Sequence, residues 1–145
     1  MSIALLDVNV LIALLDPHHI HMHAAHAWLG EHGRKPVASC PLTINGCIRV
    51  LTGARYPGGP ATIEDVAQRL REFQKRAGHE YWPDDINVLD DGFDLIAMHG
   101  GHQLTDIYLL GLAVRHGGHL ITFDRTIPWR AVKGAKASHL KILVS

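Results

Sequence analysis

Uninterrupted hydrophobic positions, rather than alternating ones, mark two short segments of the chain, residues 3–6 and residues 119–123. Continuous apolar runs of this length are typical of parallel strands that are covered on both faces of a sheet. Further strands are predicted over residues 36–39, near residues 81–82 and over residues 140–144. An acidic residue directly follows each of the two continuous runs, Asp7 and Asp124.

Between these runs, apolar residues recur at helical spacing, which predicts amphipathic or buried helices. The expected helices cover residues 8–15, 20–33, 43–52 and 62–78, with a weaker one at 93–99 and a buried one at 105–116. Strands that alternate with helices indicate an α/β fold, a central, mostly parallel β-sheet with helices on both faces. The length of 145 residues is that of one domain, so we expect a single domain over residues 1–145.

Charge is balanced overall but unevenly distributed along the chain. The formal net charge is zero, which excludes a global basic field for nucleic acid. Between Ala77 and Val114 there are acids but no Lys or Arg, whereas after Asp124 there are Lys and Arg residues but no acids. The basic segment, above all Arg125, Arg130 and Lys133, is a candidate for binding a phosphate backbone; the alternative is an ordinary solvated loop.

Two features bear on the cellular compartment. Cys40 and Cys47 form no Cys-x-x-Cys motif and no disulfide framework, as expected for reduced thiols. The first residues lack a basic, apolar signal sequence, and no uncharged apolar run reaches the ~18 residues of a membrane span. We therefore expect a soluble, cytoplasmic protein with no membrane association.

Three aspartates carry the candidate chemistry. Asp7 and Asp124 follow buried parallel strands, and Asp106 lies at the start of the predicted buried helix. Functional sites of α/β sheets form outside the carboxyl ends of the strands, where these acids would meet. Converging carboxylates repel one another, and a hard divalent cation such as Mg²⁺ or Mn²⁺ relieves that repulsion. Carboxylates with such an ion are suited to phosphodiester hydrolysis.

Each aspartate also has a simpler interpretation. Asp7 and Asp124 are equally explained as turn residues after strands, and Asp106 as a helix cap. A phosphatase that uses Asp7 as its nucleophile is a further alternative. Phosphatases of the haloacid-dehalogenase type need a second Asp two residues on, where this chain has Asn9, so this alternative ranks last.

Several motifs resemble those of PIN domains, in order and spacing. Residues 5–12 resemble the first motif, an Asp-x-Asn after the first strand, and residues 105–124 are similar to the last two acidic motifs. Residues 40–51 are similar to the helix after the second strand in a subgroup of VapC-type toxins. The similarity covers nearly the whole chain and implies a PIN-like fold.

This resemblance implies a metal-dependent endoribonuclease, the toxin of a toxin–antitoxin pair. It also implies a VapB-type antitoxin as protein partner and a homodimer. Carried over by position, Asp7, Asp106 and Asp124 are the acids of the catalytic metal site, and Asn9 and Thr122 orient them.

One departure from the family pattern concerns the helix after the second strand. PIN domains generally have a Glu there, which by the resemblance falls near Ile44, yet residues 43–51 contain no acid. Asn45 or Thr43 would offer an uncharged oxygen, and Ile44→Glu is expected to strengthen metal binding. One metal is then favoured over two. The alternative function is a catalytically weak PIN domain that binds RNA or an antitoxin without efficient cleavage.

A cluster of histidines, residues 18–26, offers a rival metal site. His19, His23 and His26 are spaced i, i+4 and i+7 on one predicted helix, a spacing that suits Zn²⁺ or Ni²⁺. No carboxylate or thiolate of that helix completes a site before Glu31. A solvated or partly packed helix face is the favoured interpretation.

Overall fold

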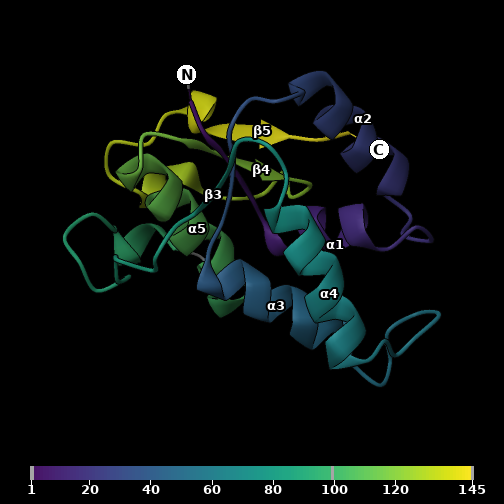
Figure 1. Ribbon diagram of the computed structural model, residues 1–145. Coiled ribbons are helices and arrows are strands. Elements are labelled where there is room, and N and C mark those ends of the chain that lie inside the picture. Colours follow the sequence, from purple (N-terminus) through teal and green to yellow (C-terminus); the bar gives the residue numbers. More distant parts are fainter. Residues whose placement is uncertain (1, 99, 145) are drawn as a thin grey trace.

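A five-stranded parallel sheet forms the centre of the molecule in the computed structural model, which describes residues 2–98 and 100–144 (Figure 1). The strands are β1 (Ala4–Leu6), β2 (Val37–Ser39), β3 (His79–Tyr81), β4 (His119–Thr122) and β5 (Leu140–Ile142). Their order is β3-β2-β1-β4-β5, and every neighbouring pair is parallel. From β1 the chain adds β2 and β3 on one side of the sheet and then β4 and β5 on the other, so the strand order switches between β1 and β4. Ligands of α/β proteins bind in the crevice at such a switch point.

The helices follow the predicted pattern closely. They are α1 (Val8–Leu15), α2 (Met22–His32), α3 (Pro41–Leu51), α4 (Ile63–Gln74) and α5 (Leu104–Arg115). Thr62 caps α4, because its hydroxyl accepts a hydrogen bond from the backbone N–H of Asp65 at 3.1 Å. Figure 1 shows α3 and α4 side by side at the lower edge of the molecule, with α5 to their left.

Two predicted helices differ from the structure. The second begins at Met22 rather than at residue 20, because the N–H of Met22 bonds the carbonyl of His19 in a turn, and Ile20 is 82% exposed. The segment at 93–99 forms only a short 3₁₀ turn, Leu95–Ala97. Phe93, at the start of this segment, forms a β-bridge with Val132 instead, and His99 lies outside the described residues.

The sheet has a buried core on each face, because successive strand residues point to opposite sides. Leu5, Ala38 and Leu120 pack with α5 on one face. Ala4, Leu6, Val37 and Ile121 pack with α1, α3 and α4 on the other. All of these strand residues are at most 1% exposed, so the predicted parallel sheet with helices on both faces is confirmed.

Two further expectations can be compared with the structure. Cys40 and Cys47 are buried and unpaired, and burial raises the pKa of both thiols. Within residues 2–98 and 100–144, no helix combines the length and the apolar character needed to cross a membrane.

Candidate active site

Asp7 lies at the carboxyl end of β1 and is only 2% exposed. Its carboxylate accepts the backbone N–H of Val10 at 2.8 Å, which caps α1, and it also accepts the hydroxyl of Thr122. Burial, with smaller contributions from the charges of Asp106 and Asp124, raises the pKa of Asp7 to about 7 despite these two hydrogen bonds. The ionised form of this side chain therefore lacks a compensating positive charge.

Asp106 lies in the first turn of α5 and is half-buried. Burial raises the pKa of its carboxyl group to about 6, and the negative charge of Asp124 adds to this shift. The charges of Asp106 and Asp124 also raise the pKa of Asp7. All three predicted acids therefore lie close enough at the β1–β4 crevice to interact electrostatically. The fold thus brings together three residues that are far apart in sequence.

Thr122 joins two of these acids. Its hydroxyl donates to Asp7 and accepts the backbone N–H of Asp124 at 3.0 Å. The Asp124 carboxylate in turn accepts the backbone N–H and the hydroxyl of Thr126, at 2.8 and 2.7 Å. In the described part of the chain, no three His, Cys, Asp or Glu side chains already stand in a metal-binding arrangement, so the carboxylates would have to move closer to share an ion.

A surface hollow of about 600 Å³ opens beside Asp106. Its walls come from the start of α1, one side of α3, the loop after β3 and the start of α5. The residues that line it are Val8, Asn9, Leu42, Asn45, Gly46, Arg49, Asp84, Thr105 and Asp106. Asn9 and Asn45, both predicted site residues, therefore lie in the same hollow as Asp106.

The predicted position of the missing acid, near Ile44, stays a prediction. Ile44 does not line the hollow but packs against the core shared by α1 and α3. The α3 positions that face the hollow include 45 and 46. A Cβ atom on Gly46 would lie 2.8 Å from Cγ2 of Val8, so glycine there allows α1 and α3 to pack closely.

Thr43 does not face the hollow either. It is fully buried, and its hydroxyl accepts the backbone N–H of Cys40 and donates to the carbonyl of Cys40, both at 3.0 Å. These bonds fix the start of α3. The Thr43 hydroxyl is therefore engaged in capping α3, and its supply of an oxygen to the site stays a prediction.

Sequence reasoning missed two charged residues of the hollow, Asp84 and Arg49. Asp84 accepts the backbone N–H of Leu42 at 3.1 Å and the hydroxyl of Tyr108 at 3.0 Å, so it ties the start of α3 to α5. In the sequence it is one acid among many in the acidic stretch. The sequence could have identified Arg49, because it lies seven residues after Leu42 and four after Asn45, which places all three on one face of a helix.

The predicted RNA-binding residues are dispersed. Arg125 is exposed and directly follows Asp124. The guanidinium of Arg130 lies 4.7 Å from the ring centroid of Trp129, in a different hollow. Lys133 lines a third hollow, together with Asp90 and Phe93. Of the three, only Arg125 is adjacent to a candidate site acid.

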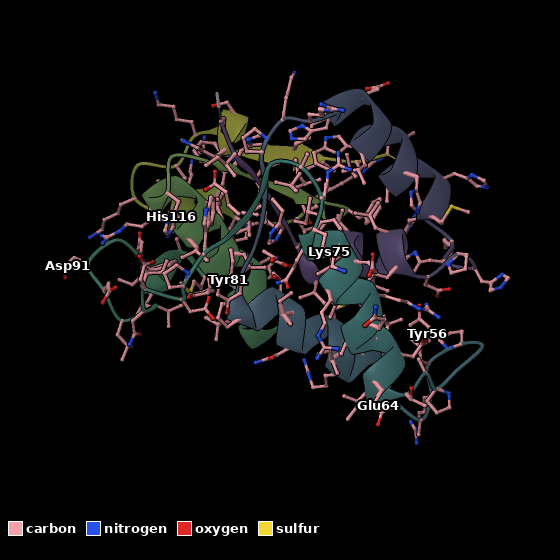
Figure 2. The ribbon with its side chains drawn as sticks, in the orientation of Figure 1. Tyr56, Glu64, Lys75, Tyr81, Asp91 and His116 are labelled. Carbon is pink, nitrogen blue, oxygen red and sulfur yellow. The ribbon has the colours of Figure 1, made fainter. Side chains whose placement is uncertain are left out.

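The acidic loop after β3, which carries Asp84, Asp85, Asp90, Asp91 and Asp94, extends well beyond the site. Figure 2 shows Asp91 at the outer end of this loop, on the side of the molecule opposite Tyr56. Asp91 is exposed and is absent from the lining of the hollow beside Asp106. The acidity of the loop as a whole is therefore not a property of the site.

The histidine cluster does not form the predicted row on one helix. His19 precedes α2, and its ring accepts the backbone N–H of His21 at 3.0 Å. The ring of His26 bonds the carbonyl of Leu14 at 3.1 Å. No set of histidines within the described ranges is arranged as a metal site.

Comparisons with known proteins cover nearly the whole chain. The model of the PIN domain family matches residues 4–133. Ribonuclease VapC44 of Mycobacterium tuberculosis (strain ATCC 25618 / H37Rv) is 41% identical over 97% of this chain and 99% of its own length. Ribonuclease VapC39 of the same strain is 36% identical over 90% of this chain and 95% of its own length. Ribonuclease VapC38 is 39% identical over 83% of this chain and 84% of its own length.

Proposed function

The chain belongs to the PIN domain family and resembles its VapC-type members from end to end, and we propose that it is the endoribonuclease toxin of a toxin–antitoxin pair. It would hydrolyse phosphodiester bonds of RNA with the help of a divalent metal ion. The observation that carries the proposal is the convergence of Asp7, Asp106 and Asp124 at the β1–β4 crevice. The names of the relatives, all ribonucleases, support RNA as the substrate.

The donor chemistry of these acids fits Mg²⁺ or Mn²⁺. All three offer only oxygen atoms, which hard cations prefer. Burial and mutual repulsion disfavour their charges, so a cation would stabilise the ionised forms of Asp7 and Asp106. When bound, such an ion supplies positive charge against a phosphate and lowers the pKa of water at the site.

The surrounding residues hold the acids in place. Val10 and Thr122 fix Asp7, and the hydroxyl of Thr122 links it to the backbone at Asp124. Asn9 and Asn45 line the hollow with uncharged amides that can bond phosphate or ribose oxygens without adding repulsion. The hollow next to Asp106 is thus the proposed path of the RNA strand.

A cleavage assay tests the proposal directly. The purified full chain, free of antitoxin, is incubated with an RNA pool in Mg²⁺, Mn²⁺ or chelator, and the new RNA ends are sequenced. We expect cuts at defined positions that disappear in chelator and in the Asp106→Asn variant. Cleavage that persists in chelator contradicts metal dependence; RNA binding without cleavage in either metal would favour the catalytically weak alternative.

A VapB-type antitoxin and a second copy of the chain are the proposed protein partners. The VapC names of the relatives support the first. Exposed apolar residues before and at the start of α5 support a partner surface, because Leu95, Ile96 and Leu104 are 53%, 95% and 41% exposed. Light scattering of the purified chain tests the homodimer: a monomer at micromolar concentration contradicts it.

A further inference from the structure

One face of α3 is turned toward the hollow along its whole length. Leu42, Asn45, Gly46 and Arg49 are spaced i, i+3, i+4 and i+7, and all four line the hollow. The opposite face, with Thr43, Cys47 and Leu51, is buried in the core. Arg49 therefore stands on the same wall as Asn45, in the last turn of the helix.

The guanidinium of Arg49 has no partner among the residues that the structure describes. Some other arginines do have partners: Arg69 pairs with Asp65 at 2.8 Å, and Arg76 donates to the carbonyl of Gly33. Of the described residues that line the hollow, Arg49 alone is cationic. Both carboxylate oxygens of Asp84, the other acid of the hollow, already accept hydrogen bonds from Leu42 and Tyr108.

An RNA strand that enters this hollow meets the carboxylate of Asp106, which repels its phosphates. A cation on the facing wall offsets that repulsion, and the planar fork of an arginine matches the oxygens of a phosphate. We propose that Arg49 binds a phosphate of the RNA backbone next to the one that is cut. This inference rests on the proposed ribonuclease function. A protein carboxylate is the competing ligand, but the amides of Asn9 and Asn45 in the same hollow favour a nucleic acid backbone.

RNA binding without cleavage separates this role from catalysis. The full chain in EDTA is titrated into a short, labelled single-stranded RNA over a series of KCl concentrations. Arg49→Gln removes the charge, Arg49→Lys keeps it, and Arg71→Gln is the matched control. Arg71 is likewise exposed and lies in the last turn of a helix, α4, but does not line the hollow.

We expect Arg49→Gln to weaken RNA binding about tenfold and to reduce the salt slope by about 0.7, the value for one phosphate contact on a single strand. Arg49→Lys keeps the slope, and Arg71→Gln changes neither quantity. RNA affinity and slope unchanged in Arg49→Gln overturn the inference. So does a weaker complex of Arg49→Gln with the antitoxin at unchanged RNA affinity, since it assigns the guanidinium to a protein carboxylate.

A parallel arm measures RNA cleavage by the wild-type chain in Mn²⁺. If the wild type cleaves RNA but Arg49→Gln binds RNA as the wild type does, the role of Arg49 is rejected. The ribonuclease function is then retained. Absence of cleavage rejects the function, while the binding series still decides whether Arg49 contacts RNA. The two failures are therefore distinguishable.

Discussion

Two neighbouring surfaces that meet at Asp106 differ in burial and in charge. The acidic wall, formed by Asp7, Asp106 and Asp124 at the ends of β1 and β4 and the start of α5, is buried or half-buried, and of its three acids only Asp106 lines the hollow. The α3 wall is open: Asn45 and Arg49 are exposed, and its side chains there are neutral or cationic. We propose a division of roles, in which the acidic wall would hold a cation and the open α3 wall would receive RNA.

Loss of an acid from the acidic wall should have the largest effect. Asp106→Asn and Asp7→Asn are expected to lower the RNA cleavage rate in Mn²⁺ by at least about 100-fold, since each removes a carboxylate charge that would hold the metal ion at the reacting phosphate. Both variants should keep the far-UV circular dichroism of the wild type. Asp91→Asn, at the outer end of the acidic loop, is the control and should cleave normally. Wild-type rates in either site variant would remove that residue from the site.

Ionisation of Asp7 in the acidic wall should lower the free energy of unfolding of the metal-free chain as the pH rises. The pKa of Asp7 is about 7 in the folded chain and 3.8 ordinarily. Because the folded pKa is raised, the stability linked to protonated Asp7 is fully present below about pH 4 and is lost as the pH rises through 7. In chelator at pH 8, Asp7→Asn should therefore be more stable than the wild type by on the order of a few kcal/mol.

Urea unfolding at pH 5 and pH 8 measures this difference. Asparagine keeps the cap on α1, whereas Asp7→Ala loses it at a cost of about 1 kcal/mol and so separates capping from charge. An equal dependence of stability on pH in the wild type and in Asp7→Asn would show that Asp7 does not titrate in this range.

An acid added to the open α3 wall should strengthen metal binding. Asn45→Asp places a carboxylate in the hollow and is expected to raise the affinity for Mn²⁺ several-fold, because charge and oxygen count set the affinity for hard cations. Ile44→Glu, predicted from the sequence to do the same, should instead destabilise the fold by about 1–3 kcal/mol, because Ile44 packs against the core. Calorimetric titration with Mn²⁺ and melting curves test both. Tighter binding by a fully stable Ile44→Glu would contradict this account of α3.

A smaller effect is expected from Gln103, which braces the acidic wall. Gln103 directly precedes α5, and its amide donates to the carbonyl of Thr126 at 2.9 Å, so it ties the Asp124 loop to the helix that carries Asp106. Gln103→Leu should lower Mn²⁺ affinity by roughly 10-fold or less, the lower range for groups that orient metal ligands. Gln68→Leu, at an exposed position of α4, should leave the Mn²⁺ affinity unchanged. Equal affinities in the two variants would assign Gln103 a purely structural role.

The acidic wall was predictable from the sequence because its signals are local. A buried apolar run followed by an acid identifies Asp7 and Asp124, and a helix that is buried from Ile107 to Ala113 identifies the element that carries Asp106. The continuous parallel strands then required their ends to meet at one edge of the sheet.

The open wall was less predictable because it depends on which face of α3 is turned outward. The choice between Ile44 and its neighbours is set by the close contact of Gly46 with Val8, two segments that are distant in the sequence. The role of Asp84 likewise depends on its contacts with Leu42 and Tyr108 across the fold. The early start predicted for α2 was wrong for a local reason, the turn formed by residues 19–22.

The measurement that most directly tests the central claim is a calorimetric titration of the metal-free chain with Mn²⁺. It compares the wild type with Asp7→Asn, Asp106→Asn and Asp124→Asn at one pH. We predict a saturable Mn²⁺ site in the wild type that is lost or strongly weakened in each of the three variants. Binding of equal affinity in the wild type and all three variants would contradict the account, because the acids at the β1–β4 crevice would then not hold the ion.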